Sequence, residues 1–150
     1  MSTPFTIRPA TEADQSTIRR LIREARLAPM GLSWPNFLVA EADGETVGIG
    51  QVKSHADGSR ELASIAVVPD RQGQGIGSAI IKALLGREAG VTLHLTCRSE
   101  LEGYYERFEF QRLERAEYPP HFGRMVPVVN LVMRFFGMRI IVMRRSGTGR

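Results

Sequence analysis

The spacing of apolar residues changes repeatedly along the chain between a period of two and a period of three to four, which predicts alternating strands and helices. Strand-like segments are expected at residues 5–9, 37–42, 46–53, 61–68, 91–97, 110–115 and 140–143. Helical spacing is expected around residues 18–25, 76–85, 101–108 and 125–136. This order predicts a mixed α/β sheet of about seven strands with flanking helices, in one domain over residues 1–150.

Turn and cap residues predict where several of these strands and helices begin and end. Thr11, with Asp14 three residues later, is typical of a capping box before the first helix, which Pro29 and Gly31 are expected to end. Asp43-Gly44 between two apolar runs predicts a tight hairpin.

Composition narrows the class of protein. The chain is 43% hydrophobic and 24% charged, as in an ordinary globular protein. Cys97 is the single cysteine, which excludes an internal disulfide framework and a multi-cysteine metal cage, and no metal is expected. The first residues show no apolar signal segment, and the longest apolar stretch, 125–133, is too short to span a bilayer. These features predict a cytoplasmic protein without a membrane partner.

Charge is unevenly distributed along the chain. The segment 118–150 holds six arginines and no acidic residue, although the net charge of the chain is only +4. A basic segment can attract nucleic acid, a membrane surface or a polyphosphate ligand. The arginines are spaced among apolar residues, so solvated side chains along a helix and a strand are the favoured interpretation, and nucleic acid is not a favoured partner.

One segment, residues 67–78 (Val-Val-Pro-Asp-Arg-Gln-Gly-Gln-Gly-Ile-Gly-Ser), carries recognisable chemistry. Its glycines at 73, 75 and 77 let the backbone approach a ligand closely, and the segment leads into a helix N-terminus that favours an anion. It lacks the lysine of a P-loop and the glycine spacing of a dinucleotide-binding turn. The segment therefore predicts a pyrophosphate-binding turn of another kind.

This segment resembles the acetyl-CoA site of the GNAT superfamily of N-acetyltransferases. Gln72, Gly75 and Gly77 match the family signature of Gln or Arg, two residues, Gly, one residue, and Gly or Ala. The opening residues 7–11, the Asp43-Gly44 hairpin and residues 104–107 (Tyr-Tyr-Glu-Arg) also fit, so the resemblance covers nearly the whole chain. It implies acetyl-CoA as the co-substrate and direct transfer of an acetyl group to a primary amine in a ternary complex.

The resemblance also implies roles for particular residues. The backbone of Ile65, Ala66 and Val67 would pair with the pantetheine arm, and the N–H of Val67 would stabilise the oxyanion. The pyrophosphate would be held by Gln72, Gly73, Gln74, Gly75, Ile76, Gly77 and Ser78. Tyr105 matches the tyrosine that protonates the leaving thiolate, with Tyr104 as the alternative. Glu61 matches the position of a glutamate base, and a solvated carboxylate at the strand entrance is the equally weighted alternative. His55 and His94 are expected to be structural.

Three positions depart from the family pattern, with Arg98, Glu109 and Leu101 in place of Asn, Gly and Ala. They keep open a second hypothesis, a regulatory module that binds acyl-CoA without turnover. The acceptor is expected to be a small-molecule or peptide amine that is neutral or acidic. The resemblance implies that residues 27–36 and 118–138 would bind it. The apolar helix in the latter segment could instead form a homodimer surface.

Overall fold

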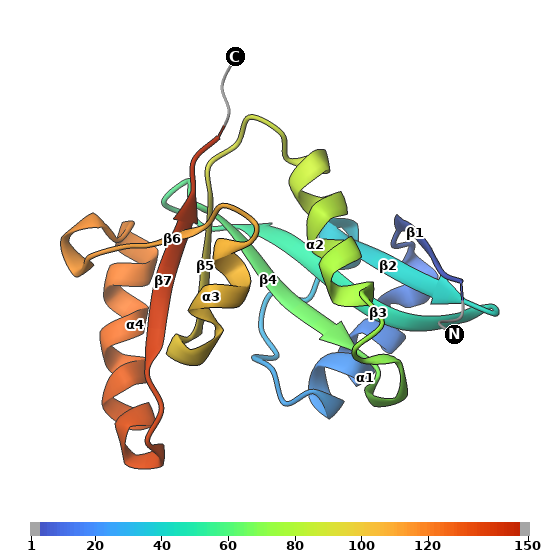
Figure 1. Ribbon diagram of the computed structural model, residues 1–150, viewed down its shortest axis with the longest axis horizontal. Helices are drawn as coiled ribbons and strands as arrows, with labels where there is room; N and C mark the ends of the chain where they lie inside the picture. Colours follow the sequence, from blue (N-terminus) through green and yellow to red (C-terminus); the bar gives the residue numbers. More distant parts are fainter. Residues whose placement is uncertain (1–3, 148–150) are drawn as a thin grey trace. The chain divides into compact units, whose positions relative to one another are not determined.

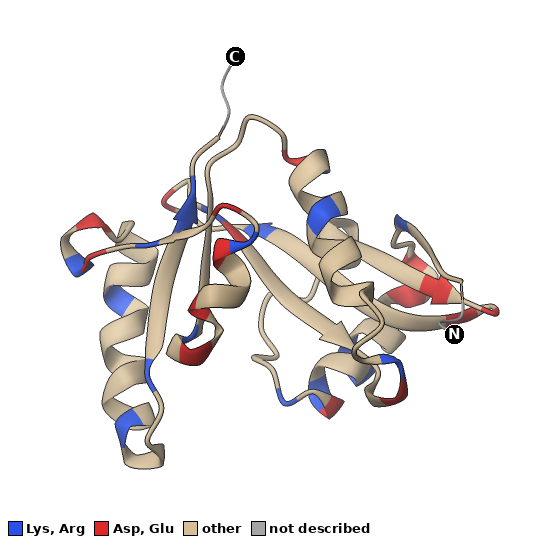
Figure 2. Cartoon of the chain, in the orientation of Figure 1, with Lys and Arg blue, Asp and Glu red and all other residues tan. Residues whose placement is uncertain are grey.

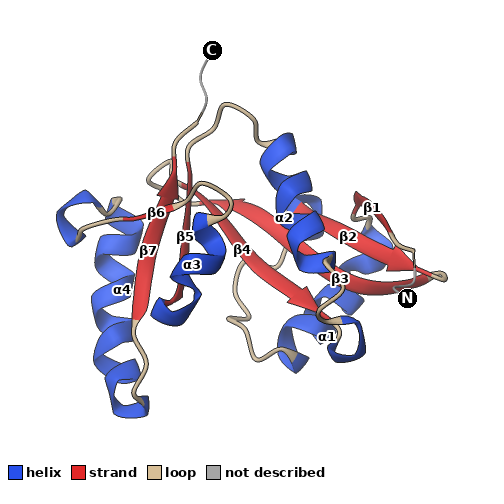
Figure 3. Cartoon of the chain, in the orientation of Figure 1, coloured by secondary structure: helices blue, strands red, loops and turns tan. Residues whose placement is uncertain are grey.

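The computed structural model describes residues 4–147, and this range forms seven β-strands and four α-helices (Figures 1 and 3). The strands are β1 (Thr6–Pro9), β2 (Phe37–Ala42), β3 (Glu45–Ser54), β4 (Arg60–Val67), β5 (Leu93–Arg98), β6 (Gln111–Arg112) and β7 (Ile140–Arg145). The helices are α1 (Gln15–Glu24), α2 (Ile76–Arg87), α3 (Glu102–Glu106) and α4 (Pro120–Met133). This order confirms the predicted mixed α/β fold of seven strands with flanking helices.

The chain divides into two compact units. The first contains Met1–Lys53 and Leu62–Glu88, and the second contains Ser54–Glu61 and Ala89–Arg150. Strand β4 contributes its first two residues to the second unit and the rest to the first. A single domain over the whole chain stays a prediction.

In the first unit the strand order is β1-β2-β3-β4. Strand β2 is antiparallel to both β1 and β3, with Val39 opposite Arg8 on one side and Ile49 on the other. The predicted hairpin is confirmed, because Ala42 pairs with Glu45 across Asp43 and Gly44. Both turn residues have positive φ, 52° and 77°, as a type I′ turn requires.

Helices α1 and α2 cover opposite faces of this part of the sheet. The apolar stripe of α1 packs with Ile49 of β3 in one core cluster. The neighbouring residues Gly48 and Gly50 face the other way, since side chains alternate along a strand. A Cβ atom at Gly50 would lie 2.7 Å from Ile80 of α2, so the missing side chains allow α2 to approach the sheet closely.

In the second unit β5 pairs in parallel with the start of β4, through Glu61 and His94, and antiparallel with β7. Strand β7 pairs in turn with β6, giving the order β5-β7-β6. Helix α4 packs against β7 through a small apolar cluster made by Leu113, Phe122, Val126 and Val142.

Three predicted boundaries are wrong. Helix α1 ends at Glu24, with Ala25 as its C-cap, before the Pro29 and Gly31 that were expected to end it. The strand expected at 110–115 is only two residues long, although the Leu113 backbone N–H still donates to Val142 of β7 while its side chain joins the cluster beneath α4. The last helix begins at Pro120 rather than near residue 125, since proline suits the first helical turn. Between residues 4 and 147, no helix has both the length and the apolar content that a bilayer span requires.

The start of α1 is held by an ion pair that links it to β1. Both Nη atoms of Arg8 donate to the Asp14 carboxylate, at 2.8 and 3.0 Å, and the Thr11 backbone N–H donates to the same group at 2.7 Å. This confirms the expected capping box of Thr11 and Asp14, in the short 3-10 helix Glu12–Asp14 that precedes α1, and Arg8 is a further partner that local sequence could not show. The hydrogen bonds from Arg8, helped by Thr11 and opposed by burial, lower the pKa of Asp14 to about 2.

We expect Asp14→Asn to lower the free energy of unfolding at neutral pH by about 1–2 kcal/mol. The folded-state pKa lies below the ordinary value of 3.8, so this stability is present above pH 4 and is lost as the pH falls toward 2. Urea unfolding of both proteins at several pH values measures the difference. A gap that stays constant between pH 5 and pH 2.5 would contradict this assignment.

Candidate functional site

The glycine-rich segment forms a turn from the end of β4 into α2. Residues Pro69–Arg71 make a short 3-10 helix, and the Gln72 side chain donates to the Val67 carbonyl at 3.1 Å, which ties the turn to the strand end. Gly73 and Gly75 have φ of 80° and 84°, and Gly75 is the N-cap of α2. The turn therefore needs two residues in a backbone region that side chains disfavour.

The space beside this turn is open. A Cβ atom at Gly73 or Gly75 would meet nothing within 4 Å, so crowding by the protein does not explain either glycine. The first N–H groups of α2, at Ile76, Gly77 and Ser78, have no partner within the helix, as at every helix start. The positive end of the helix dipole and a backbone without side chains make this turn suitable for a phosphate group.

One polar atom of the turn has no partner. Gln74 Oε1 is buried and accepts no hydrogen bond from any described residue. A buried acceptor without a donor costs about 1–3 kcal/mol. A bound molecule with an N–H or O–H group would recover this energy once the Gln74 side chain turned toward the open space.

Strand β4, before the turn, has an irregular backbone. Ser64 lies in the strand with φ of 61°, the left-handed geometry found in β-bulges. Its hydroxyl accepts a hydrogen bond from the buried side chain of Gln51 at 2.8 Å. Sequence analysis missed this pair, whose one signal is a glutamine among the apolar residues of β3. The bulge comes directly before Ile65, Ala66 and Val67, the residues expected to pair with a pantetheine arm.

Glu61 is the second residue of β4 and belongs to the second unit, and it is not a solvated carboxylate. The residue is 7% exposed, and its Oε1 atom lies 2.7 Å from Nε2 of His55. The His55 ring stacks on the ring of His121, with centroids 3.5 Å apart. A buried carboxylate bonded to an imidazole can exchange protons through that ring, as a base requires.

Tyr105 lies in α3 among aromatic rings. Its ring makes edge contacts with Tyr104 and Phe110, at centroid distances of 5.1 and 6.3 Å. Burial raises the pKa of Tyr105 to about 12, and Cys97 and Tyr104 add to the shift. The phenol therefore keeps its proton at neutral and moderately alkaline pH. The side chain of Glu61 contacts His55, whereas that of Tyr105 contacts the rings of Tyr104 and Phe110.

Cys97 is buried on β5 and its thiol contacts the sulfur of Met143 at 3.9 Å. Burial raises the pKa of this thiol to about 11, so it has little thiolate character. This agrees with the expectation that Cys97 is a small apolar residue rather than a nucleophile.

Glu109 stands where the family pattern has glycine, and the structure explains the pattern. Its φ is 72°, a conformation that costs a residue with a side chain about 1 kcal/mol. Arg145 holds the turn, since Nε donates to the Phe108 carbonyl at 3.0 Å and Nη2 lies 3.2 Å from the Glu109 carboxylate. The departure from glycine is therefore accommodated within the second unit.

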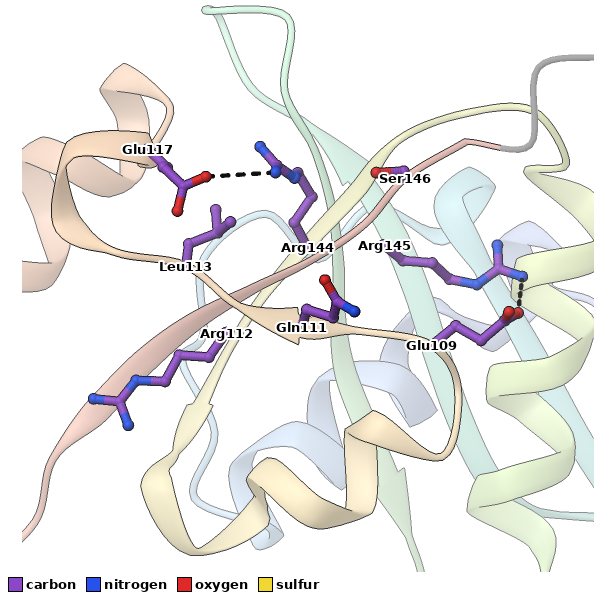
Figure 4. A pocket seen from close by; sticks show the side chains of 8 residues that line it. All are labelled: Glu109, Gln111, Arg112, Leu113, Glu117, Arg144, Arg145 and Ser146. Atoms are coloured by element: carbon purple, nitrogen blue, oxygen red, sulfur yellow. Dashed lines mark hydrogen bonds and ion pairs between the residues drawn. The ribbon is translucent and has the colours of Figure 1, made fainter.

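A cavity of about 480 Å³ lies along β6 and β7 (Figure 4). Four of its charged groups pair with one another, Arg145 with Glu109 and Arg144 with Glu117, the latter at 3.6 Å. The fifth, Arg112, pairs with Glu102 outside the lining at 3.7 Å, so each of these charges has a partner within the protein.

A second cavity, of about 550 Å³, lies beside α1. Its lining joins the arginines 19 and 23 to the apolar side chains of Ile22, Leu27 and Leu32. Gln15 fixes the following loop, donating to the Leu32 carbonyl at 2.6 Å and accepting from the Trp34 N–H at 2.9 Å. Trp34 packs on the core of the first unit, as expected for a loop anchor.

The sequence profile of the acetyltransferase (GNAT) domain matches residues 33–112. A comparison with curated proteins finds no match.

Among solved structures, the chain is similar to N-acetylglutamate synthase from Neisseria gonorrhoeae complexed with coenzyme A and N-acetyl-glutamate, with 21% identity and a TM-score of 0.73. That match covers 97% of this chain but only 35% of the synthase, so the chain spans about a third of its length.

The ribosomal-protein-S18-alanine N-acetyltransferase from Escherichia coli matches with 22% identity and a TM-score of 0.68, covering 98% of this chain and 97% of that one. A diaminobutyrate acetyltransferase from Paenibacillus lautus, bound to L-2,4-diaminobutyric acid and coenzyme A, matches with 19% identity and a TM-score of 0.58, covering 75% and 81%. At these identities the structural likeness shows the fold.

Proposed function

Because the chain belongs to the GNAT acetyltransferase family, we propose that it transfers the acetyl group of acetyl-CoA to a primary amine of a small molecule or peptide. The reaction is direct attack of the amine within a ternary complex. The observation that carries this proposal is the turn at Gly73 and Gly75, which leaves open space at the start of α2.

The residues of the turn fit the phosphate end of coenzyme A. Gln72, Gly73, Gln74, Gly75, Ile76, Gly77 and Ser78 would hold the pyrophosphate through backbone N–H groups. The unpartnered Gln74 oxygen suits a hydroxyl or amide donor of the same molecule. The backbone of Ile65, Ala66 and Val67 would hold the pantetheine arm, with the Val67 N–H directed at the thioester carbonyl. Bound acetyl-CoA supplies an acyl group activated by a thiol leaving group.

Tyr105 and Glu61 would carry out the two proton transfers of the reaction. The raised pKa of Tyr105 keeps its hydroxyl protonated, so it can donate to the departing sulfur. An amine attacks only when neutral, and Glu61, hydrogen-bonded to His55, would take up the amine proton.

The acceptor would carry a carboxylate. Arg19 and Arg23 line the cavity beside α1 together with apolar side chains, a combination that suits an amino acid or peptide end with an apolar portion. Two of the similar structures contain amino-acid ligands, N-acetyl-glutamate and 2,4-diaminobutyric acid, which supports this class of acceptor.

A homodimer also stays a prediction. Helix α4 and the turn after it expose Val128, Leu131, Val132, Phe135 and Phe136, a stripe suited to a second copy. Figure 2 shows basic and no acidic residues on α4 and the turn after it, and Arg150 of the basic segment lies outside the described residues. The cytoplasm is the compartment that we predict.

Coenzyme A and acetyl-CoA should raise the melting temperature, and ATP should not. A ligand at a hundredfold excess over its Kd stabilises by about 2.7 kcal/mol, which raises the melting temperature by roughly 5–11 °C for a chain of this size. Gly75→Ala should abolish this shift, since its Cβ enters the open space. Gly44→Ala is the matched control, because Gly44 has a similar φ and equally open surroundings in the β2–β3 hairpin. Loss of the shift in both variants, or no shift in the wild type, would contradict the assigned turn.

Tyr105→Phe should lower kcat by about a hundredfold with little change in KM for acetyl-CoA, because the ring packing survives and the proton is lost. Tyr104→Phe is the control and should keep kcat. Glu61→Gln should also lower kcat, and a melting curve of each variant checks its fold. If Tyr104→Phe loses activity instead, the role of Tyr105 is wrong. If acetyl-CoA raises the melting temperature but no amine causes release of free coenzyme A, the hypothesis of a regulatory module that binds acyl-CoA without turnover would be favoured.

An acceptor panel should show preference for 2,4-diaminobutyrate over 1,3-diaminopropane, the same diamine without its carboxylate. Arg23→Gln should lower kcat/KM for 2,4-diaminobutyrate by about tenfold, or 1.4 kcal/mol, and should leave kcat/KM for 1,3-diaminopropane unchanged. Equal rates for the two diamines, or turnover of polycations alone, would remove the assigned acceptor class.

A further inference from the structure

Three side chains converge in the second unit outside the phosphate turn. His55 follows β3 directly, Glu61 is the second residue of β4, and His121 is the second residue of α4. Each offers one ligand atom, and these atoms all lie within 4.8 Å of one another. The closest pair is His55 Nε2 and Glu61 Oε1, at 2.7 Å. Two imidazoles and a largely buried carboxylate therefore meet at one point.

The backbone around this cluster is fixed by Asp57. One carboxylate oxygen accepts from the backbone N–H and the hydroxyl of Ser59, at 2.8 and 2.6 Å. The other accepts from the backbone N–H of His121 at 2.8 Å, which joins the loop to the start of α4. The backbone N–H of His55 donates to the Ser59 carbonyl at 2.9 Å and closes the loop. These hydrogen bonds, of which those from Ser59 have the largest effect, hold the pKa of Asp57 far below its usual range.

The donor set is one that a transition metal takes. Two histidine nitrogens and one glutamate oxygen are the protein ligands of many zinc sites, which keep the fourth position for water or substrate. In a tetrahedral zinc site the ligand atoms lie about 3.4 Å apart, as follows from bonds of about 2.1 Å. The farthest pair, at up to 4.8 Å, must therefore close, and the His55–Glu61 pair at 2.7 Å must open. The stacked rings of His55 and His121 must also turn apart, because an imidazole binds a metal ion in the plane of its ring.

We propose that His55, Glu61 and His121 bind a divalent transition-metal ion, with Zn²⁺ as the reference ion. The ion would link the β3–β4 loop to helix α4. The absence of a metal expected from the sequence rested on the lone cysteine, and this donor set needs no cysteine. The ion would also occupy the carboxylate that the proposed function assigns as the base, so it would inhibit acetyl transfer. This last consequence rests on the proposed function, whereas the binding itself does not.

The test uses the full chain without an affinity tag, stripped of metal and titrated with Zn²⁺ against a chromophoric chelator. We expect one ion per chain and a raised melting temperature. His55→Ala and His121→Phe should each weaken binding by about tenfold or more. Phenylalanine at 121 keeps a flat ring against His55, so this variant preserves the stacking while removing the ligand. His94→Ala is the control and should keep the affinity.

Binding that is unchanged in both His55→Ala and His121→Phe, or no binding at micromolar Zn²⁺, would overturn the proposal. Melting curves of the metal-free variants confirm that each is folded. Acetylated amine, measured by mass spectrometry because Zn²⁺ binds the free thiol of coenzyme A, gives the second readout. One equivalent of Zn²⁺ should suppress product in the wild type. Zinc binding with undiminished turnover refutes the inhibition, whereas zinc binding without any coenzyme A stabilisation refutes only the proposed function.

Discussion

The left-handed backbone at Gly73 and Gly75 is the constraint on which the proposed chemistry depends. Strand β4 must end and helix α2 must begin within a few residues, and Gly75 serves as the N-cap with φ of 84°. A residue with a Cβ would be strained there by about 1–2 kcal/mol and would also fill the space beside the helix start. One pair of glycines thus satisfies the backbone geometry and keeps the anion-binding end of the helix accessible.

The same principle, a missing side chain, positions α2 itself. Gly48 and Gly50 lie on the face of β3 toward α2, where added Cβ atoms would come within 3 Å of isoleucine side chains of the helix and of β4. The opposite face of β3 carries Ile49 and packs against the core that includes α1. Alternation along one strand therefore gives a close contact on one side and a filled core on the other. Because α2 is held at its middle by this contact, the position of its N-terminus is determined by the sheet.

Much of the fold and part of the site could be predicted from sequence, because the relevant signals are local. The Asp43-Gly44 hairpin, the Asp14 cap and the glycine turn are each encoded within a few residues. The features that were missed join residues of different elements. Arg8 pairs with Asp14 across the β1–α1 boundary, Gln51 bonds to Ser64 across two strands, and His121 stacks on a histidine 66 positions earlier. No periodicity or spacing rule links such residues, since only tertiary packing brings them together.

Glu61 shows how backbone position and side-chain chemistry become coupled. Its main chain is fixed by the parallel pairing with His94, and its carboxylate is buried beside His55. A carboxylate that is only 7% exposed requires a donor or a cation, and His55 is the donor that the structure supplies. Proton acceptance and metal binding both satisfy this requirement through the same oxygen atoms, and each excludes the other. His121 is fixed at the start of α4 by its hydrogen bond to Asp57, so it brings a second imidazole to the same point and adds a ligand for the proposed metal ion.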